Sequence, residues 1–169
     1  MKAFSLIFVL FVNLFAAQDY QGLVNSISKY AIRIGTGPNK IYTFVDPLCS
    51  KSQTFIDLID SRKDLQTKNS YYIFLYRLPK FNSEKYIQYI YQSSHRLDSL
   101  KEIMIYEDYD VLEDFKLKQK TLDTTNDIAK VAEGLKMKRR PYLLIFDQGS
   151  SYCRVSEGTA PCMEESDFK

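Results

Sequence analysis

The chain has 169 residues, which is long enough for one domain with a substantial buried core. Its formal net charge of +2 is too small to argue for nucleic acid or a membrane surface as a partner. Three Cys and one His, without CxxC or HxxH spacing, offer no metal site, and we expect neither a metal nor a cofactor.

The first 17 residues have the layout of a secretory signal peptide. Lys2 precedes an apolar run over residues 3–12, and residues 14–17 resemble a cleavage region. The run is short for a transmembrane helix, but the cleavage region is not ideal, so an uncleaved anchor stays open as the alternative. We expect export to the periplasm and one domain over residues 18–169.

The mature chain should open with a short helix followed by a buried strand. Gly35-Thr-Gly-Pro38 would end that helix. Residues 41–45 are β-branched, aromatic or Thr throughout, which is typical of a strand covered on both faces. Asp46-Pro47 ends the strand, because Pro lacks an N–H and fixes φ. The helix is predicted from apolar residues at helical spacing: Tyr20, Leu23, Val24, Ile27 and Ala31.

Cys49 falls where the next helix would begin. Apolar residues at helical spacing between Phe55 and Ile59 supply the buried side of that helix. The unpaired N–H groups and partial positive charge of a helix N-terminus stabilise a thiolate, so the layout is that of a nucleophilic thiol on an α/β scaffold. Position 52 is Ser, which makes the motif Cys-x-x-Ser and not the redox motif Cys-x-x-Cys.

A second strand and a block of helices should follow. The strand is expected over residues 71–78, ended by Pro79. Ser83 would cap a helix that is interrupted near His95 and whose pattern continues to Met104. We expect most of the three tyrosines in this helix to pack in the core, and some to remain at a partly exposed surface: Tyr86, Tyr89 and Tyr91.

The last part of the chain predicts a short helix, a long helix and two strands. Val111 to Phe115 indicates the short helix. The stripe from Ile128 to Leu135 indicates the long one, with a cap near Asp123 or Thr124. A strand over 142–146 and a turn at 148–149 into residues 152–155 complete the order α-β-α-β-α(α)-α-β-β.

Four stretches in this order resemble the thioredoxin fold, and more closely the catalytic domain of periplasmic disulfide isomerases of the DsbC/DsbG type. They are residues 42–49 (Tyr-Thr-Phe-Val-Asp-Pro-Leu-Cys), 74–79, 83–104 and 128–149. The resemblance implies an α/β, thioredoxin-like fold with a mixed sheet and a helical insertion at about 83–119. It also implies that Pro141 is a cis proline facing the thiol, and that the partners are protein thiols and disulfides.

The sequence departs from this family in three places. Ser52 stands where the family has its second, resolving Cys, and Arg140 where it usually has Thr. Only residues 18–39 precede the first expected strand, which leaves no counterpart of the family's N-terminal dimerisation domain, so we expect a monomer.

Cys49 has two interpretations, and so does Ser52. Cys49 is either a nucleophile that forms mixed disulfides or a leftover thiol on a scaffold without redox chemistry. Without a resolving Cys, an external thiol or reductant must complete the reaction. Ser52 could donate a hydrogen bond to the thiolate or cap the helix.

A basic run stands beside the expected cis proline. Lys136, Lys138, Arg139 and Arg140 place four positive charges in five positions, and with Lys51 they could surround Cys49, favour its thiolate or attract acidic partners. A solvated loop is the equally weighted alternative. We assign Lys51 and Arg140 to substrate binding, and expect the lone His95 to be a surface residue.

The three cysteines leave one thiol over in an exported chain. Cys153 and Cys162 are nine positions apart and would close a natural loop, which leaves Cys49 free. Pairing of Cys49 with either of them is the alternative. The leading hypothesis for the function is monothiol exchange through Cys49, with Ser52 and Pro141 in the catalytic site. The rival hypothesis is a binding or assembly module without turnover.

Overall fold

The computed structural model describes residues 19–112, 115–146 and 153–158. The signal-peptide prediction for residues 1–17 and the turn at 148–149 lie outside these ranges. No helix within them is long and apolar enough to cross a membrane.

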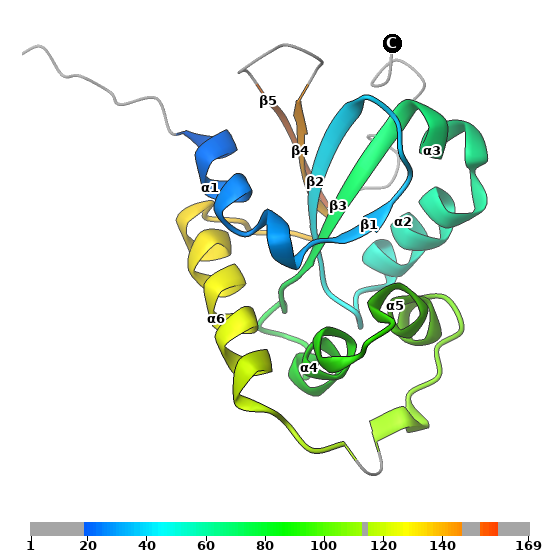
Figure 1. The fold of residues 1–169 in the computed structure, drawn as a ribbon, viewed down its shortest axis with the longest axis vertical. Helices are drawn as coiled ribbons and strands as arrows, with labels where there is room; N and C mark the ends of the chain where they lie inside the picture. The colour runs from blue at the N-terminus through cyan, green and yellow to red at the C-terminus, as the bar shows by residue number, and fades with distance from the viewer. Residues whose placement is uncertain (1–18, 113–114, 147–152, 159–169) are drawn as a thin grey trace, which may run out of the picture.

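Five strands form one mixed sheet in the order β1-β3-β2-β4-β5 (Figure 1). β2 and β3 are parallel, and all other neighbouring pairs are antiparallel. In the parallel pair Val45 lies opposite Leu75, so the two strands end side by side at the same edge of the sheet. The strands are β1 Ile32–Ile34, β2 Asn39–Val45, β3 Asn69–Leu75, β4 Tyr142–Phe146 and β5 Cys153–Glu157.

Helices cover both faces of the sheet. α1 and α6 lie on one face, α2 and α3 on the other, and α4 and α5 cross the end of the sheet between them (Figure 1). α4 packs against α6, and α5 packs against α2, so this helical block joins the two layers. The helices are α1 Tyr20–Ser26, η1 Ser28–Tyr30, α2 Ser50–Ser61, α3 Lys63–Lys68, α4 Glu84–Gln92, α5 Arg96–Met104, η2 Asp110–Leu112 and α6 Gln119–Gly134.

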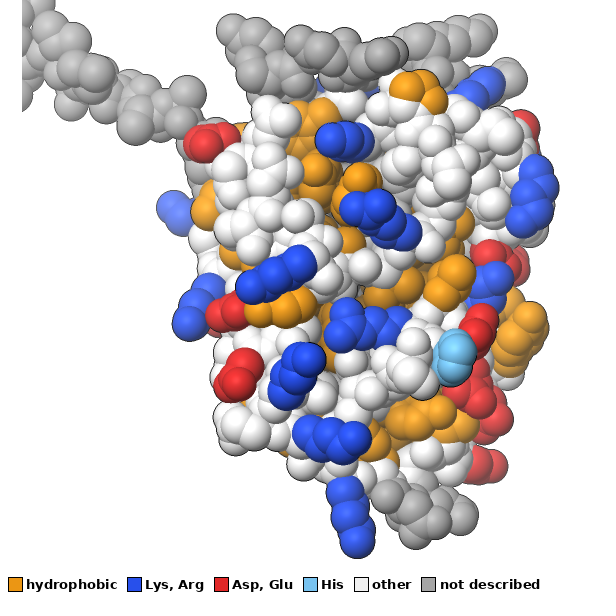
Figure 2. All heavy atoms as spheres, viewed as in Figure 1, with side chains coloured by type: hydrophobic (Ala, Val, Ile, Leu, Met, Phe, Trp, Pro, Cys, Tyr) orange, Lys and Arg blue, Asp and Glu red, His pale blue; other side chains and the backbone are white. Residues whose placement is uncertain are grey.

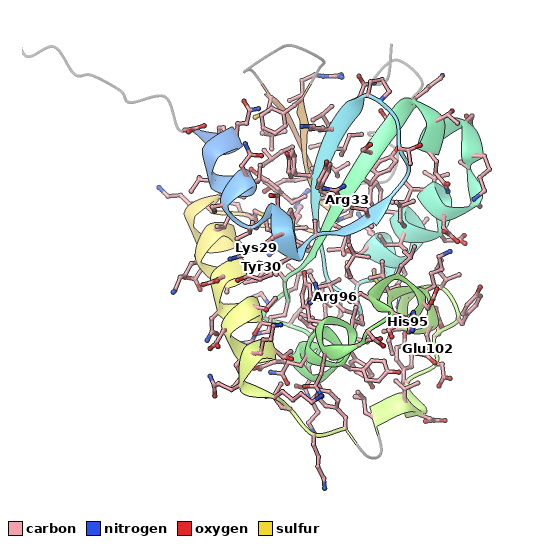
Figure 3. The ribbon with its side chains drawn as sticks, in the orientation of Figure 1. Lys29, Tyr30, Arg33, His95, Arg96 and Glu102 are labelled. Atoms are coloured by element: carbon pink, nitrogen blue, oxygen red, sulfur yellow. The ribbon has the colours of Figure 1, made fainter. Side chains whose placement is uncertain are left out.

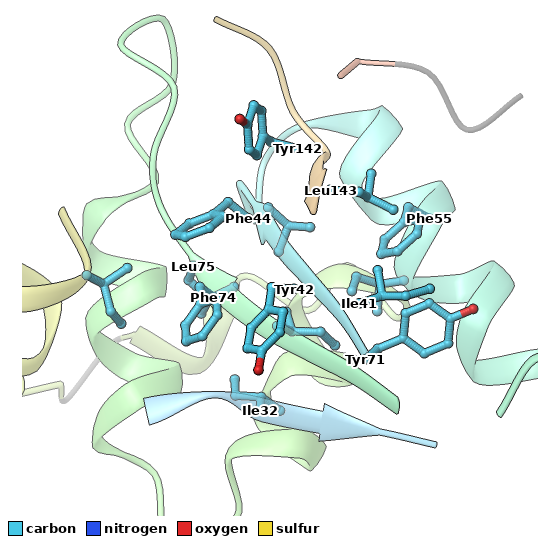
Figure 4. Close-up of a cluster of buried hydrophobic side chains, with 14 of the residues drawn as sticks. Ile32, Ile41, Tyr42, Phe44, Phe55, Tyr71, Phe74, Leu75, Tyr142 and Leu143 are labelled. Atoms are coloured by element: carbon cyan, nitrogen blue, oxygen red, sulfur yellow. The ribbon is translucent and has the colours of Figure 1, made fainter. Parts of the chain in front are cut away.

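The side chains of β2 alternate between two hydrophobic layers, and all five residues from Ile41 to Val45 are buried (Figure 4). Phe44 packs against Phe74 with ring centroids 5.1 Å apart on the α1 and α6 side. On the α2 side, the Phe55 ring meets Tyr71 edge-on at 6.1 Å. The prediction of a strand covered on both faces is confirmed.

The helical block is tied to the sheet by a buried tyrosine. The hydroxyl of Tyr91 accepts a hydrogen bond from the Leu75 N–H at 2.9 Å, and burial raises the pKa of this phenol. The guanidinium of Arg96 lies over the Tyr91 ring, 5.5 Å from its centroid (Figure 3). Tyr91 is buried, whereas Tyr86 and Tyr89 are partly exposed and pack against the core, so the mixed expectation for these three is confirmed.

Three local expectations need correction. β1 follows η1 directly, in a segment that we did not predict as a strand, because three residues are too few to show a period of two. A short helix, α3, follows α2, where no helix was predicted, and it buries only Leu65. α6 begins at Gln119 and not near Asp123, since Thr121 and Thr124 supply its buried side where apolar residues were sought.

Candidate functional site

Cys49 occupies the N-cap position of α2, as predicted. Its N–H donates to the Asp46 carbonyl at 3.1 Å, which closes the turn between β2 and the helix. Its own carbonyl accepts the first helical hydrogen bond, from the Gln53 N–H at 2.9 Å. The residue is 6% exposed, so its sulfur reaches solvent only through the cleft described below.

A buried carboxylate, that of Asp46, organises the surroundings of this turn. Asp46 Oδ1 accepts from the Leu48 N–H at 2.9 Å. Its Oδ2 accepts from the Leu78 N–H and from the Ser83 hydroxyl, the latter at 3.0 Å. Asp46 therefore links the Cys49 turn to the segment after β3 and to the start of α4. Ser83 is the N-cap residue of α4, as predicted, but its hydroxyl donates to Asp46 and makes no capping hydrogen bond to the helix.

Ser52 has a contact that neither of its interpretations anticipated. Its side chain is fully buried, and its Oγ accepts a hydrogen bond from the Asp46 N–H at 3.3 Å. The cap interpretation is wrong, because Ser52 is the third residue of α2 and the N-cap position belongs to Cys49. The hydroxyl thus holds the end of β2 against the first turn of α2.

The loop before β4 faces the thiol. The Arg140–Pro141 peptide bond is cis, as the family resemblance implied. The Cys49 thiol donates a hydrogen bond to the Arg140 carbonyl, with 4.0 Å between Sγ and O. The Pro141 carbonyl accepts from the Gly158 N–H at 2.8 Å, so this loop is also anchored to the end of β5.

The side chain of Arg140 is buried within the protein. Its Nε donates to the Tyr76 carbonyl at 3.3 Å, and Nη1 donates to the Arg139 carbonyl at 2.9 Å. The guanidinium lies 4.8 Å from the centroid of the Tyr76 ring. Burial lowers the pKa of the Arg140 guanidinium. Electrostatic attraction to Tyr76, Asp46 and Cys49 acts in the opposite direction and raises this pKa.

Cys49 opens into a cleft of about 460 Å³. Two predicted binding residues, Lys51 and Arg140, line it together with Lys138 and Arg139, whereas Lys136 is not among its lining residues. Lys80 also lines the cleft and was not predicted. The remaining lining residues are Leu78, Pro79 and Gly158.

The other predicted residues lie apart from this cleft. His95 is the N-cap residue of α5, with a side chain that is 79% exposed, which confirms a surface position (Figure 3). Cys153 begins β5 and forms no disulfide with Cys49, the other described cysteine. Its expected partner Cys162 lies outside the described residues, so their pairing stays a prediction. Among the residues described, no group of three or more His, Cys, Asp and Glu could hold a metal ion.

Sequence reasoning missed the part played by Lys80 and Gly158. Lys80 reaches the cleft because β3 ends beside β2. The residues paired between these two strands are thirty positions apart in the sequence. Gly158 has φ of +81°, and a Cβ there would lie 2.8 Å from Arg139 Cδ. A glycine just after the last strand is the one local signal that could have indicated a close approach.

No protein-family model matches this sequence, and no curated protein does. Solved structures match it over most of its length. A disulfide interchange protein from Neisseria gonorrhoeae is 16% identical, with 83% of this chain and 93% of that chain covered and a TM-score of 0.62. The fold is thioredoxin-like.

Two further structures with a thioredoxin-like fold support the same conclusion. Proteus mirabilis ScsC in a compact conformation is 16% identical, covers 85% of this chain and 74% of its own, and has a TM-score of 0.64. Helicobacter pylori DsbG is 18% identical and has a TM-score of 0.60, over 75% of this chain and 60% of that chain. The predicted resemblance to the DsbC/DsbG type, including its helical insertion, therefore holds at the level of the fold.

Proposed function

We propose that this protein carries out thiol–disulfide exchange through Cys49 as a single nucleophilic thiol. The observation that carries the proposal is the position of its sulfur, at the N-cap of α2 and hydrogen-bonded to the Arg140 carbonyl at 4.0 Å. The helix N-terminus favours a negative charge there, and the first turn of α2 contains no acidic residue. The names of the similar structures, a disulfide interchange protein and DsbG, support the same class of reaction.

The reaction is balanced without a cofactor. The Cys49 thiolate attacks one sulfur of a substrate disulfide, the substrate S–S bond breaks, and a mixed disulfide forms while the second sulfur leaves as a thiolate that takes a proton from water. An external thiolate then attacks the substrate sulfur of the mixed disulfide; a disulfide between the external thiol and the substrate forms, and Cys49 leaves as a thiolate. The partners are accordingly protein thiols or disulfides and a diffusing thiol or reductant.

Ser52 makes the second step slow. In a two-cysteine motif the resolving thiol attacks from within the same protein, at a high effective concentration. The Ser52 hydroxyl is a far weaker nucleophile, and it is occupied by the Asp46 N–H. We infer that Ser52 acts as a positioning residue and that the mixed disulfide is long-lived.

The cis loop and Lys51 complete the proposed site. The Arg140 carbonyl faces the sulfur, so it is the backbone group placed to meet a bound substrate segment. The Pro141 carbonyl is bonded to Gly158, and Pro141 contributes the cis bond that turns the Arg140 carbonyl toward the thiol. Lys51, in the first turn of α2, adds a positive charge at the edge of the cleft.

We further propose that the protein is exported to the periplasm as a monomer and carries a Cys153–Cys162 disulfide. The signal-like residues 1–17 support export, and the sequence separation of the two cysteines supports the pairing. The loop would contribute about 2–3 kcal/mol to stability in the chain-entropy model. Peptide mapping without reductant checks it, and Cys49 joined to either cysteine would overturn both the pairing and the free nucleophile.

Ser52→Cys tests the catalytic proposal. Position 52 is one helical turn from the N-cap, so the new thiol should form a disulfide with Cys49 and resolve mixed disulfides. We expect the variant to reduce insulin disulfides with turnover, whereas the wild-type protein should do so poorly. Ser61→Cys, at the other end of the 12-residue α2 and about 18 Å away, is the matched control that should not.

The rival function, a binding module without turnover, is favoured by the burial of Cys49. A thiol that is 6% exposed can be unreactive if the cleft does not admit a second sulfur. Alkylation of the native and the urea-unfolded protein separates the two functions. A native rate that is at least comparable to the unfolded rate at pH 7 supports exchange, and a native rate about a hundredfold lower supports the module.

A further inference from the structure

We propose that the Cys49 cleft selects anionic partners, namely disulfides or thiols whose sulfur is flanked by carboxylate groups. This inference rests on the proposed thiol exchange and adds the class of substrate. It depends on the charges that line the cleft and on how each of them is held.

Among the residues that the structure describes, every ionisable side chain that lines the cleft, apart from the thiol itself, is cationic: Lys51, Lys80, Lys138, Arg139 and Arg140. These residues come from the first turn of α2, the segment after β3 and the loop before β4. Within residues 19–112, 115–146 and 153–158, no acidic residue lines the cleft. Elsewhere, on the face seen in Figure 2, Lys and Arg side chains are scattered among hydrophobic ones and form no single patch. The described lining therefore brings several cations together around one sulfur.

Four of these five cations are exposed and face solvent at the rim. Within the parts of the chain that the structure describes, no salt bridge involves Lys51, Lys80, Lys138 or Arg139. One acid beside the rim is Glu157, whose Oε1 accepts from the Lys138 backbone N–H at 3.2 Å.

Two of the rim side chains are placed by contacts with their neighbours, Lys80 through its ammonium group and Arg139 through its aliphatic stem. The Nζ of Lys80 lies 4.7 Å from the centroid of the Phe81 ring. The aliphatic stem of Arg139 lies against the backbone of Gly158, where a Cβ would come within 2.8 Å of Cδ. Both cations are thus held beside the cleft while their charged ends stay accessible.

Arg140 differs from the four rim residues because its charged group is not available to a ligand. Its guanidinium is buried, bonded to two carbonyls and stacked on Tyr76, so it does not reach out to a ligand. The four rim residues are therefore the groups available to carboxylates. A cleft lined by one sign of charge raises the local concentration and the encounter rate of ligands of the opposite sign.

The charge acts on the approach of an anionic disulfide or thiol and supplies no group that resolves the mixed disulfide. During capture the thiolate and an anionic disulfide would repel each other, and the rim cations offset this repulsion while the S–S bond of the substrate breaks and the Cys49–substrate bond forms. The leaving thiolate is an anion too, and it takes its proton from water. Release still depends on an external thiol, since the rim supplies no nucleophile.

Two small disulfides, one anionic and one neutral, measure the selectivity of the cleft for charge. Dithiobis(nitrobenzoate) carries two carboxylates, and dithiodipyridine is neutral at pH 7; each releases a coloured thiol. The mature protein would carry Cys153→Ser and Cys162→Ser, so that Cys49 is the reacting thiol. The rate constant with the anionic probe is divided by that with the neutral probe, and this ratio is divided by the same ratio for mercaptoethanol to give a normalised ratio. We expect the normalised ratio to exceed about ten at low salt and to fall as the salt concentration rises.

Charge reversal at the rim locates the effect. Lys51→Glu with Lys138→Glu should lower the normalised ratio about tenfold or more. The rate with the neutral probe divides out of this ratio and reports separately on any change in the thiol itself. Lys118→Glu with Lys120→Glu changes the net charge equally, at exposed positions that do not line the cleft, and should leave the ratio unchanged. Equal effects of the two pairs would overturn the inference, because the selectivity would then follow the net charge and not the cleft.

The source of the carboxylates is decided by two further substrates. Oxidised glutathione represents a low-mass acidic disulfide, and a Cys peptide disulfide with Glu on both sides, compared with its Lys-flanked counterpart, represents an acidic protein segment. A wild-type preference for either anionic substrate that is lost in the Lys51→Glu, Lys138→Glu protein supports the inference. A normalised ratio near one, with Cys49 reacting readily with the neutral probe, overturns the inference alone. Absence of reaction with both probes overturns the thiol exchange and the inference together.

Discussion

The floor and the rim of the Cys49 cleft are built in opposite ways. The floor is the buried turn in which Asp46 accepts hydrogen bonds from Leu48, Leu78 and Ser83. The rim consists of the exposed cations Lys51, Lys80, Lys138 and Arg139. Buried polar groups must be fully paired, and those of the floor are bonded to one another, whereas exposed charges are inexpensive to leave unpaired.

The floor and the rim therefore have different roles. The floor joins the ends of β2 and β3 and the start of α4, so it fixes where the sulfur lies relative to the Arg140 carbonyl. The rim adds little to folding, since exposed charges contribute little to stability, but it changes the field that an approaching disulfide meets. Substitutions in the floor should therefore change stability, and substitutions in the rim should change rates.

Asp46→Ala should have the largest effect on stability. Three donors lose their acceptor in a buried site, and we expect the free energy of unfolding to fall by about 3–4 kcal/mol. Urea unfolding at pH 7 measures it. Asp57→Ala, at an exposed position of α2, is the control and should stay within about 0.5 kcal/mol of the wild-type protein. A loss for Asp46→Ala as small as that of the control would mean that the floor does not hold the turn.

Tyr71, in the core beside α2, gives a prediction about pH. Burial raises the pKa of Tyr71 to about 12, against the effect of the Asn69 amide that donates to its hydroxyl at 3.2 Å. Between pH 10 and 12 the unfolded chain releases this proton while the folded protein keeps it, so stability should fall by about 2 kcal/mol over this window.

Tyr71→Phe checks this alkaline loss. Below pH 10 the variant should lose about 1 kcal/mol through the missing hydrogen bond, but its stability should decline less steeply above pH 10. Tyr106→Phe, at a residue that is 72% exposed, is the control with an unchanged slope. Parallel curves for Tyr71→Phe and the wild-type protein would show that this phenol does not resist ionisation.

The smallest effect on stability is expected at the rim. Lys51→Glu with Lys138→Glu removes no buried contact, and each substitution should change the free energy of unfolding by no more than about 0.5 kcal/mol. The same denaturant titration measures it. A loss of several kcal/mol would show that the rim is part of the folded framework, and the division between floor and rim would fail.

The sequence predicted the elements around Cys49 better than the contacts between them, for a physical reason. Residues 41–49 carry their own signals, a run of strand-forming residues, a Pro and a helix start, so the strand, the turn and the place of Cys49 could be predicted locally. The cis bond before Pro141 came from the family resemblance and is present. Lys80 could not be assigned to the cleft, because its place depends on the pairing of β2 with β3.

Two other misses concern contacts that depend on how the chain folds back on itself. β1 has only three residues, and it is a strand because it pairs with β3 about forty positions later along the chain. The Ser52 hydroxyl was given local partners, but the shape of the turn brings the Asp46 N–H to it. Side-chain periodicity contains no information on either contact.

The central claim is that Cys49 captures disulfides and, with Ser52 beside it, releases them slowly. The direct measurement is non-reducing electrophoresis of envelope extracts from cells that express the protein, after acid trapping of thiols. We expect discrete high-mass adducts of this protein that vanish with reductant and in Cys49→Ser, and that persist in Cys153→Ser with Cys162→Ser. Absence of adducts from the wild-type protein, or an adduct pattern unchanged in Cys49→Ser, would contradict the claim and favour the binding module.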